Sequence, residues 1–184
     1  SIEKGEMFGL IGPDGAGKTT TFRMILGILA ADSGRIATCG LDPRRSRREL
    51  ADRVGYLSQR FSLYGDLSLD ENVAFFAEIH GVRDYRGARD RLLEMTQLSP
   101  FRARRADQLS GGMKQKLALA CALVAEPRIL LLDEPTTGVD PVSRREFWDA
   151  LAQLSADGMT ILLAPPYLDE AAPRHRAAHL TNGS

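Results

Sequence analysis

The stretch "GPDGAGKTT" at residues 12–20 decides the fold, because of what stands on either side of it. It follows the short apolar run "MFGLI" (7–11), which predicts a buried strand, and it leads into "TTTFRMILGIL" (19–29), which predicts a helix. Glycines let backbone N–H groups wrap around a phosphate chain, and a helix that begins there points the positive end of its dipole at the phosphates. A strand, a glycine-rich loop and a helix in this order predict a phosphate-binding α/β fold.

The loop matches the pattern G-x-x-x-x-G-K-[ST], which arises by chance in well under roughly 1% of chains of this length. Lys18 is placed to reach the outer phosphates, and the Thr19 hydroxyl is placed to hold Mg²⁺. An ordinary glycine-rich turn is the alternative interpretation. The candidate phosphate contacts are Gly12, Pro13, Asp14, Gly15, Ala16, Gly17, Lys18, Thr19 and Thr20.

A second motif, "ILLLDEP" at residues 129–135, places two acids after four apolar residues. If this strand is parallel to residues 7–11, Asp133 and Glu134 reach the same edge of the sheet as the phosphate loop. One carboxylate can then hold Mg²⁺ through water, and the next can orient or deprotonate an attacking water. A strand followed by two acids is common, and a helix cap is the alternative; beside the phosphate loop, the pair indicates a nucleoside triphosphatase.

The rest of the chain alternates between strand-like and helix-like patterns, which predicts a mostly parallel sheet flanked by helices. The central part is helical throughout, with Ser68 and Ser110 as helix caps and Pro127 closing the last helix. We therefore expect a single domain over 1–184, with a core at about 1–60 and 126–184 and an inserted helical subdomain at about 61–125. Further strands are expected at 35–40, 54–59, 128–133 and 159–164, and helices at 69–81, 85–98, 110–126 and 142–155.

The motif "LSGGMKQ" at residues 109–115 supplies a second candidate anion site. Ser110, Gly111 and Gly112 at a helix start would expose several N–H groups and a hydroxyl. The first loop already holds the triphosphate of its own chain, so this site makes sense if it grips the γ-phosphate bound by another copy. With its spacing from "GPDGAGKTT" and "ILLLDEP", the motif resembles the nucleotide-binding domain of ABC transporters, over nearly the whole chain.

This resemblance implies roles for further residues. Gln59, after the strand-like "VGYLS", is similar to the family glutamine that contacts Mg²⁺ or the attacking water and links the core to the helical insertion. Asp140 in "TTGVD" matches a residue near the dimer seam, and it is equally a candidate N-cap for the helix that opens at Pro141. The segment "FSLYGDLSLDENVAFFAEIHG" is similar to export-type cassettes of the ABC-2 kind. Tyr64, Phe75 and Phe76 then either line the groove for a membrane subunit or belong to the core.

The chain departs from the family in two ways. The family's nucleotide-stacking aromatic lies before residue 1, the chain begins at "SIEKGE" and it ends at "HLTNGS", so we expect a domain incomplete at both ends. Family members also carry a histidine after the strand at 159–164, which aligns here with Pro166 when "YLDEA" is the anchor. His175 and His179 lie too far along the chain to replace it. Proline has no ionisable group and no backbone N–H, so we expect impaired hydrolysis.

Composition limits the partners. The formal net charge is zero with 26% charged residues, and there is no basic stripe, so a nucleic-acid partner is not expected. Two isolated cysteines and no apolar run of about 18 residues favour a cytoplasmic domain, peripheral on the inner face of the cell membrane through its partner.

The resemblance thus predicts an α/β P-loop NTPase core with an inserted helical subdomain. It would bind ATP and Mg²⁺ in a dimer with a second ATP-binding domain and would serve a multi-span membrane subunit of an export system. Glu134, Gln59 and Lys18 are the expected catalytic residues, and Thr19, Gln59 and Asp133 are the expected metal-binding residues. The alternatives are a weakly hydrolysing regulatory module paired with an active cassette, and a soluble ABC ATPase without a transport role.

Overall fold

The centre of the fold is a parallel β-sheet, seen in a computed structural model that describes residues 1–59, 63–165 and 176–181. Its strands are β1 (Met7–Ile11), β2 (Val54–Leu57), β3 (Ile129–Asp133), β4 (Thr160–Ala164) and β5 (Arg176–His179). They lie in the order β2-β3-β4-β1-β5, and every pair of neighbours is parallel. The predicted α/β class with a mostly parallel sheet is therefore confirmed.

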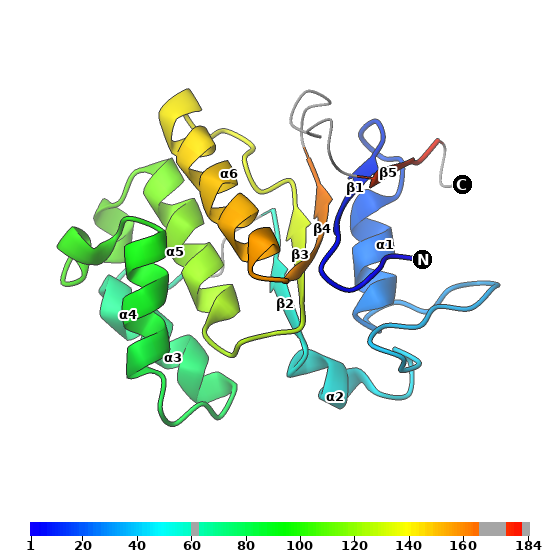
Figure 1. The fold of residues 1–184 in the computed structure, drawn as a ribbon, viewed down its shortest axis with the longest axis horizontal. Coiled ribbons are helices and arrows are strands. Elements are labelled where there is room, and N and C mark those ends of the chain that lie inside the picture. Colours follow the sequence, from blue (N-terminus) through cyan, green and yellow to red (C-terminus); the bar gives the residue numbers. More distant parts are fainter. Residues whose placement is uncertain (60–62, 166–175, 182–184) are drawn as a thin grey trace.

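Helices cover both faces of this sheet. They are α1 (Lys18–Ile25), α2 (Arg47–Ala51), α3 (Leu69–Ile79), α4 (Arg86–Met95), α5 (Gly111–Leu123) and α6 (Pro141–Ala156), with short 3₁₀ turns at Ser99–Phe101 and Ala106–Gln108. Figure 1 shows α1 on one side of the sheet and α5 and α6 on the other, with α3 and α4 gathered beyond α5. This is the layered arrangement that strands alternating with helices favour.

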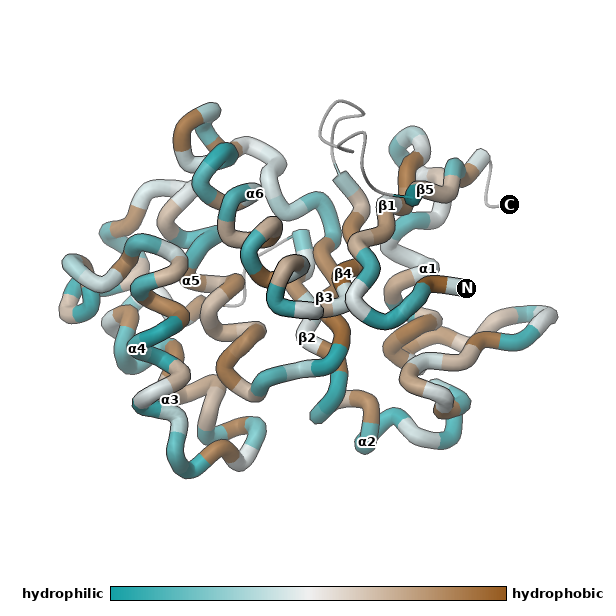
Figure 2. Tube along the Cα trace, viewed as in Figure 1, coloured by the Kyte–Doolittle hydropathy of each residue, from teal (hydrophilic) through white to brown (hydrophobic). Residues whose placement is uncertain are grey.

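The central strands are buried on both faces, as a parallel sheet between helices requires. Leu130 and Leu132 of β3 pack in one cluster with Phe147 of α6, whereas Leu131 packs in another with Phe22 of α1. Successive side chains of a strand point to opposite faces, so one continuous apolar run serves both helical layers. Figure 2 shows the resulting concentration of hydrophobic residues along β3 and β4.

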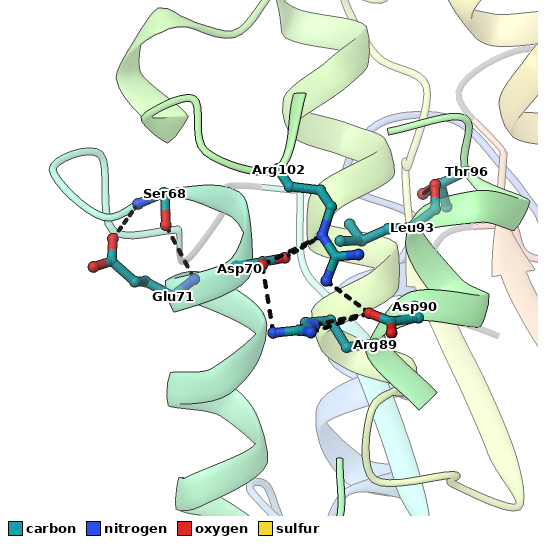
Figure 3. Close-up of polar contacts among 8 residues, drawn as sticks. All are labelled: Ser68, Asp70, Glu71, Arg89, Asp90, Leu93, Thr96 and Arg102. Atoms are coloured by element: carbon teal, nitrogen blue, oxygen red, sulfur yellow. Dashed lines mark hydrogen bonds and ion pairs between the residues drawn. The ribbon is translucent and has the colours of Figure 1, made fainter. Parts of the chain in front are cut away.

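The helical segment between β2 and β3 has an apolar cluster of its own, which includes Leu69, Leu93 and Leu117. Its first long helix, α3, begins where the sequence predicts. The Ser68 hydroxyl accepts from the backbone N–H of Glu71, whose carboxylate in turn accepts from the backbone N–H of Ser68 (Figure 3). This reciprocal cap satisfies two donors that the first helical turn leaves unpaired.

Ion pairs join the outer surfaces of α3 and α4 to the chain after them (Figure 3). The guanidinium of Arg102 lies 3.0 Å from Asp70 and 2.7 Å from Asp90, and Arg89 lies 3.4 Å from Asp70. A hydrogen bond from Arg89 at 3.1 Å, and then the one from Arg102, lower the pKa of the Asp90 carboxyl, and the hydrogen bonds to Asp70 and Asp90 raise the pKa of Arg102. Surface pairs of this kind add little stability each, so their main effect is to fix how α3, α4 and residue 102 sit together.

Two expectations about elements were wrong, and one strand was not expected. Residues 35–40 form no strand and make only the isolated bridge between Thr38 and Leu41, because Cys39 (φ 51°) and Gly40 (φ 76°) turn the chain there. The helix expected over 19–29 ends at Ile25. The strand β5 was missed because "RAAH" has no β-branched or aromatic residue and lies largely exposed; its backbone pairs with β1.

None of the described helices is long and apolar enough to cross a membrane.

Candidate functional site

The phosphate loop joins the end of β1 to the start of α1. Gly17 is the residue before α1 and has φ 99°, a left-handed conformation that a residue with a Cβ adopts only at a cost. The loop closes on itself through a hydrogen bond from the Ala16 backbone N–H to the Pro13 carbonyl at 3.1 Å. The structure therefore turns the chain back over the end of the sheet and starts a helix there, which is the geometry of an anion site.

Lys18 opens α1 and is only 7% exposed. Its ammonium donates to the Gly12 carbonyl at 2.8 Å and lies 3.7 Å from a carboxylate oxygen of Glu134 and 3.9 Å from Asp14. A buried ammonium group needs such oxygen partners, since an unpaired buried charge is expensive. Every one of these partners is an oxygen atom, so phosphate oxygens can take their places.

Asp133 ends β3 and is 2% exposed. One carboxylate oxygen, Oδ2, accepts from the Thr19 hydroxyl at 2.8 Å and from the Tyr56 hydroxyl at 3.3 Å. Burial and the charge of Asp133 raise the pKa of Tyr56 to about 12, which keeps the phenol protonated as a donor. The other oxygen, Oδ1, is buried without a hydrogen-bond partner among the described residues.

An orphaned carboxylate oxygen of this kind is uncommon and fits a bound cation or a water attached to one. The described residues contain no cluster of three or more histidine, cysteine, aspartate or glutamate side chains that could hold a metal ion. Asp133 and the neighbouring Thr19 hydroxyl offer too few ligands to hold a metal ion alone. They suit Mg²⁺, which commonly binds through one or two carboxylates together with substrate phosphates.

Glu134 follows in a left-handed conformation, with φ 50°. Its backbone N–H donates to the Ala164 carbonyl at 2.9 Å, which ties the ends of β3 and β4 together. Its carboxylate accepts from the Gln59 side-chain amide at 2.9 Å and from the Thr137 hydroxyl at 3.4 Å. The structure thus brings together the three residues expected to be catalytic, from three separate segments of the chain.

The second candidate anion site lies at the start of α5. The Ser110 hydroxyl caps this helix by accepting from the Met113 backbone N–H at 3.3 Å. Gly112 is pressed against the start of α6, where a Cβ would lie 2.2 Å from the Ser143 Cβ, so no larger residue fits. Asp140 caps α6 by accepting from the N–H groups of Val142 and Ser143, as one interpretation of the sequence predicts.

Within the described part of the chain, no hydrogen bond or ion pair joins Ser110 to the phosphate loop. Pro166 and His175 lie outside the described residues. His179 ends β5 beside Ile11, on the side of β1 away from β4.

The three aromatic residues expected either to line a docking groove or to belong to the core lie in two different environments. Phe76 lines a cavity of about 340 Å³ that β2, α3 and α5 also border. Tyr64 is 44% exposed, and its ring meets Phe75 edge-on at a centroid distance of 4.4 Å.

Sequence reasoning missed two residues that contact the acids, Tyr56 and Thr137. Tyr56 lay inside a run interpreted only as a strand. The alternation of side chains along a strand indicates which face of the sheet a residue occupies, but it does not indicate which strand lies beside it. Thr137 lay three residues after Glu134 in "TTGVD", where the interpretation concerned Asp140 alone, as a residue near the dimer seam or as a helix cap. A search for donors within three residues of each acid would have found Thr137.

A parallel sheet whose first strand leads into a glycine-rich phosphate loop, with a lysine and two acids converging there, defines a P-loop nucleoside triphosphatase. Residues 1–137 match the family model described as ABC transporter. The chain belongs to this family, as an ATP-binding domain of it.

Relatives and solved structures agree. The chain is 50% identical over 173 residues to a probable multidrug ABC transporter ATP-binding protein, YbhF, of Escherichia coli K12, covering 93% of the chain and 30% of YbhF. It is 46% identical over 173 residues to Nod factor export ATP-binding protein I of Paraburkholderia xenovorans, covering 92% of the chain and 57% of that protein.

The structure of cbiO1 from Clostridium perfringens, described as part of the ABC transporter complex cbiONQ, superimposes with a TM-score of 0.86 at 29% identity. The match covers 100% of the chain and 76% of cbiO1. The chain spans 30% of the length of YbhF and 57% of the length of the Paraburkholderia protein, so it is much shorter than these curated relatives.

Proposed function

We propose that this chain binds and hydrolyses Mg-ATP as the ATP-binding unit of an ABC-type export system. The observation that carries the proposal is the convergence of three segments of the chain on one point. Thr19 contacts Asp133 at 2.8 Å, Gln59 contacts Glu134 at 2.9 Å and Lys18 lies 3.7 Å from Glu134. A purely structural ion-pair cluster would not need the glycine-rich loop above it.

Each residue has a separate role in this proposal. Lys18 and the backbone N–H groups of residues 12–20, apart from Pro13, which has none, bind the phosphates, and Thr19, Asp133 and Gln59 hold Mg²⁺ or its waters. Mg²⁺ supplies positive charge that offsets the charge developing on the transferred phosphoryl group. Glu134 orients and deprotonates the attacking water, and the amide of Gln59 holds the Glu134 carboxylate in place.

The working unit in this proposal is a head-to-tail dimer. Ser110 and Gly111 are exposed at the start of α5, with Gly112 buried behind them, and the N–H groups and hydroxyl of this helix start can meet an anion. They make no hydrogen bond or ion pair with the phosphate loop within the described part of their own chain, so a second copy or a related cassette is the source of that anion. The segment at about 61–125, which carries these residues, acts as a helical subdomain inserted into a core at about 1–60 and 126–184.

The membrane partner and the export direction rest on the relatives. Their names refer to multidrug transport and to Nod factor export, and the alignment with each covers more than nine-tenths of this chain. We infer a multi-span membrane subunit as partner, with this domain on its cytoplasmic face. A weakly hydrolysing regulatory cassette is the second candidate, and the observation that favours it is proline at position 166.

The dimer can be tested with two substitutions. Glu134→Gln keeps the shape of the side chain but removes the base, so hydrolysis should fall by about 10²-fold or more. With Mg-ATP this variant should accumulate as a dimer of twice the monomer mass of 20.2 kDa in light scattering, and EDTA should return it to a monomer.

The matched control adds Gly111→Glu to Glu134→Gln. A Cβ at Gly111 meets nothing within 4 Å, and an acid suits a helix start, so the monomer should fold normally. The added carboxylate should repel the partner's γ-phosphate and abolish the dimer. A monomer for Glu134→Gln at saturating Mg-ATP, or a dimer that persists with Gly111→Glu, would refute the head-to-tail arrangement.

A further inference from the structure

Tyr56 of the strand β2 contacts Asp133, the acid that we propose serves the metal. It belongs to β2, one of the two edge strands of the described sheet, and it pairs with Leu131 of β3, two residues before Asp133. Its ring meets Phe22 of α1 edge-on, with centroids 6.4 Å apart and planes at 70°. Because Phe22 is fully buried, the ring has a fixed support, and its hydroxyl is brought within 3.3 Å of Asp133 Oδ2.

The Asp133 carboxylate would be poorly oriented by one donor alone. The terminal torsion of aspartate is broad and roughly two-fold, so a single hydrogen bond leaves the two oxygens free to exchange or tilt. Here Thr19 from α1 and Tyr56 from β2 both donate to the same oxygen, Oδ2. Two donors from different elements fix which oxygen is engaged, and they leave Oδ1 buried with no hydrogen bond among the described residues.

We propose that Tyr56 is a positioning residue for metal binding: its hydroxyl holds the Asp133 carboxylate so that Oδ1 faces Mg²⁺ or a water bound to it. This inference rests on the proposed function, because it assumes that Asp133 serves the metal of a bound nucleotide. Hydrogen bonds to the carboxylates around a metal typically change its affinity by about 10–100-fold when they are removed.

β2 then serves both acids from one strand end. Tyr56 donates to Asp133, and Gln59, three residues later, donates to Glu134. The tyrosine acts on the metal-binding acid and the glutamine on the proposed base. Removal of the tyrosine hydroxyl should therefore weaken metal binding selectively and leave the phosphate contacts of Lys18 intact.

The test measures how strongly Mg²⁺ tightens ATP binding. Titration calorimetry gives the ATP dissociation constant in excess Mg²⁺ and in EDTA, and the ratio of the two is the metal enhancement. Tyr56→Phe keeps the ring on Phe22, so the constant in EDTA should stay within about twofold, while the enhancement should fall about tenfold. Melting in EDTA should shift by no more than about 4 °C, the effect of one lost hydrogen bond.

Two controls separate positioning from a general structural effect. Tyr85→Phe removes a hydroxyl from the residue before α4, which packs against the separate apolar cluster of the helical segment (Figure 1), and should change neither constant. In an Asp133→Asn background, Tyr56→Phe should cause no further loss, because the side chain through which it acts is already altered.

An unchanged enhancement in Tyr56→Phe would overturn the inference, and so would an equal loss of affinity with and without metal. If the parent chain itself shows no ATP binding that depends on Mg²⁺, the proposed function fails as well.

Discussion

At the scale of single residues, the site is a set of costly placements that ligand binding would relieve. Lys18 is a buried cation, Asp133 has an orphaned buried oxygen, and Glu134 sits in a left-handed backbone conformation. Each of these placements lowers the stability of the folded state, and folding alone requires none of them. Their convergence at the ends of β1, β3 and β4 therefore indicates a site arranged for phosphate and metal.

Pro166 provides a prediction about catalysis. Asp133 pairs with Ala164 and Glu134 bonds to the Ala164 carbonyl, so the chain just after β4 starts out beside the acids. From the family resemblance, which aligns a histidine with position 166, we expect a histidine there to donate to the γ-phosphate and to hold the attacking water in register with Glu134. Such a donor is typically worth about 10²–10³ in rate, so Pro166→His should raise kcat at least tenfold with ATP affinity nearly unchanged.

Pro166→Ala is the matched control in the same steady-state ATPase assay, because it restores backbone freedom without an imidazole. It should not raise kcat. A parent chain that turns over as fast as its histidine variant would contradict the expectation that proline at 166 impairs hydrolysis.

At the scale of elements, the starts of α5 and α6 form one joint. Ser110 caps α5, Asp140 caps α6, and Gly112 lets the two helix starts meet at Ser143. The joint places the candidate anion site on the helical side and the segment after the two acids on the core side. A change in the cap of α6 should therefore change the stability of the fold. Because the cap is the carboxylate of Asp140, this effect should depend on pH.

Asp140 has a pKa lowered from its ordinary 3.8, first by its hydrogen bonds with Ser143. A carboxyl group with a lowered folded-state pKa stabilises the fold above the ordinary pKa, and this stabilisation is lost as pH falls through the folded value. An asparagine at this position would cap the helix without titrating. We expect the melting temperature of Asp140→Asn to fall less than that of the parent between pH 5 and about 3.

Circular dichroism melts of both proteins across that pH range check this expectation. Parallel curves for the parent and Asp140→Asn would show that the cap contributes nothing that depends on its charge.

At the scale of the whole molecule, local patterns predicted much of the fold and less of its assembly. The start of α3 at Ser68 and the strands around "MFGLI" and "ILLLD" depend on side chains within a few residues, and all of them form where expected. The strand β5 depends on backbone pairing with β1, and residues 35–40 depend on a turn at Cys39. Neither leaves a periodic side-chain pattern.

The candidate site divides in the same way. Sequence motifs contain the phosphate loop, the two acids and Gln59. Because the strands are parallel, these residues come together at one edge of the sheet. The contact of Tyr56 with Asp133 requires β2 to lie beside β3, although 77 positions separate the two residues along the chain. A sequence pattern fixes the face of a strand but does not say which strand is its neighbour, so this contact appears only in the folded chain.

The most direct test of the central claim is calorimetric titration of Mg-ATP into the parent chain and into Lys18→Ala. The ammonium should contribute an interaction on the order of 1.5–3 kcal/mol with the outer phosphates, so the variant should bind at least about tenfold more weakly. Lys4→Ala, which removes an exposed positive charge outside the loop, should bind as the parent does. Equal affinity of the parent and Lys18→Ala for Mg-ATP would contradict the assignment of residues 12–20 as the nucleotide site.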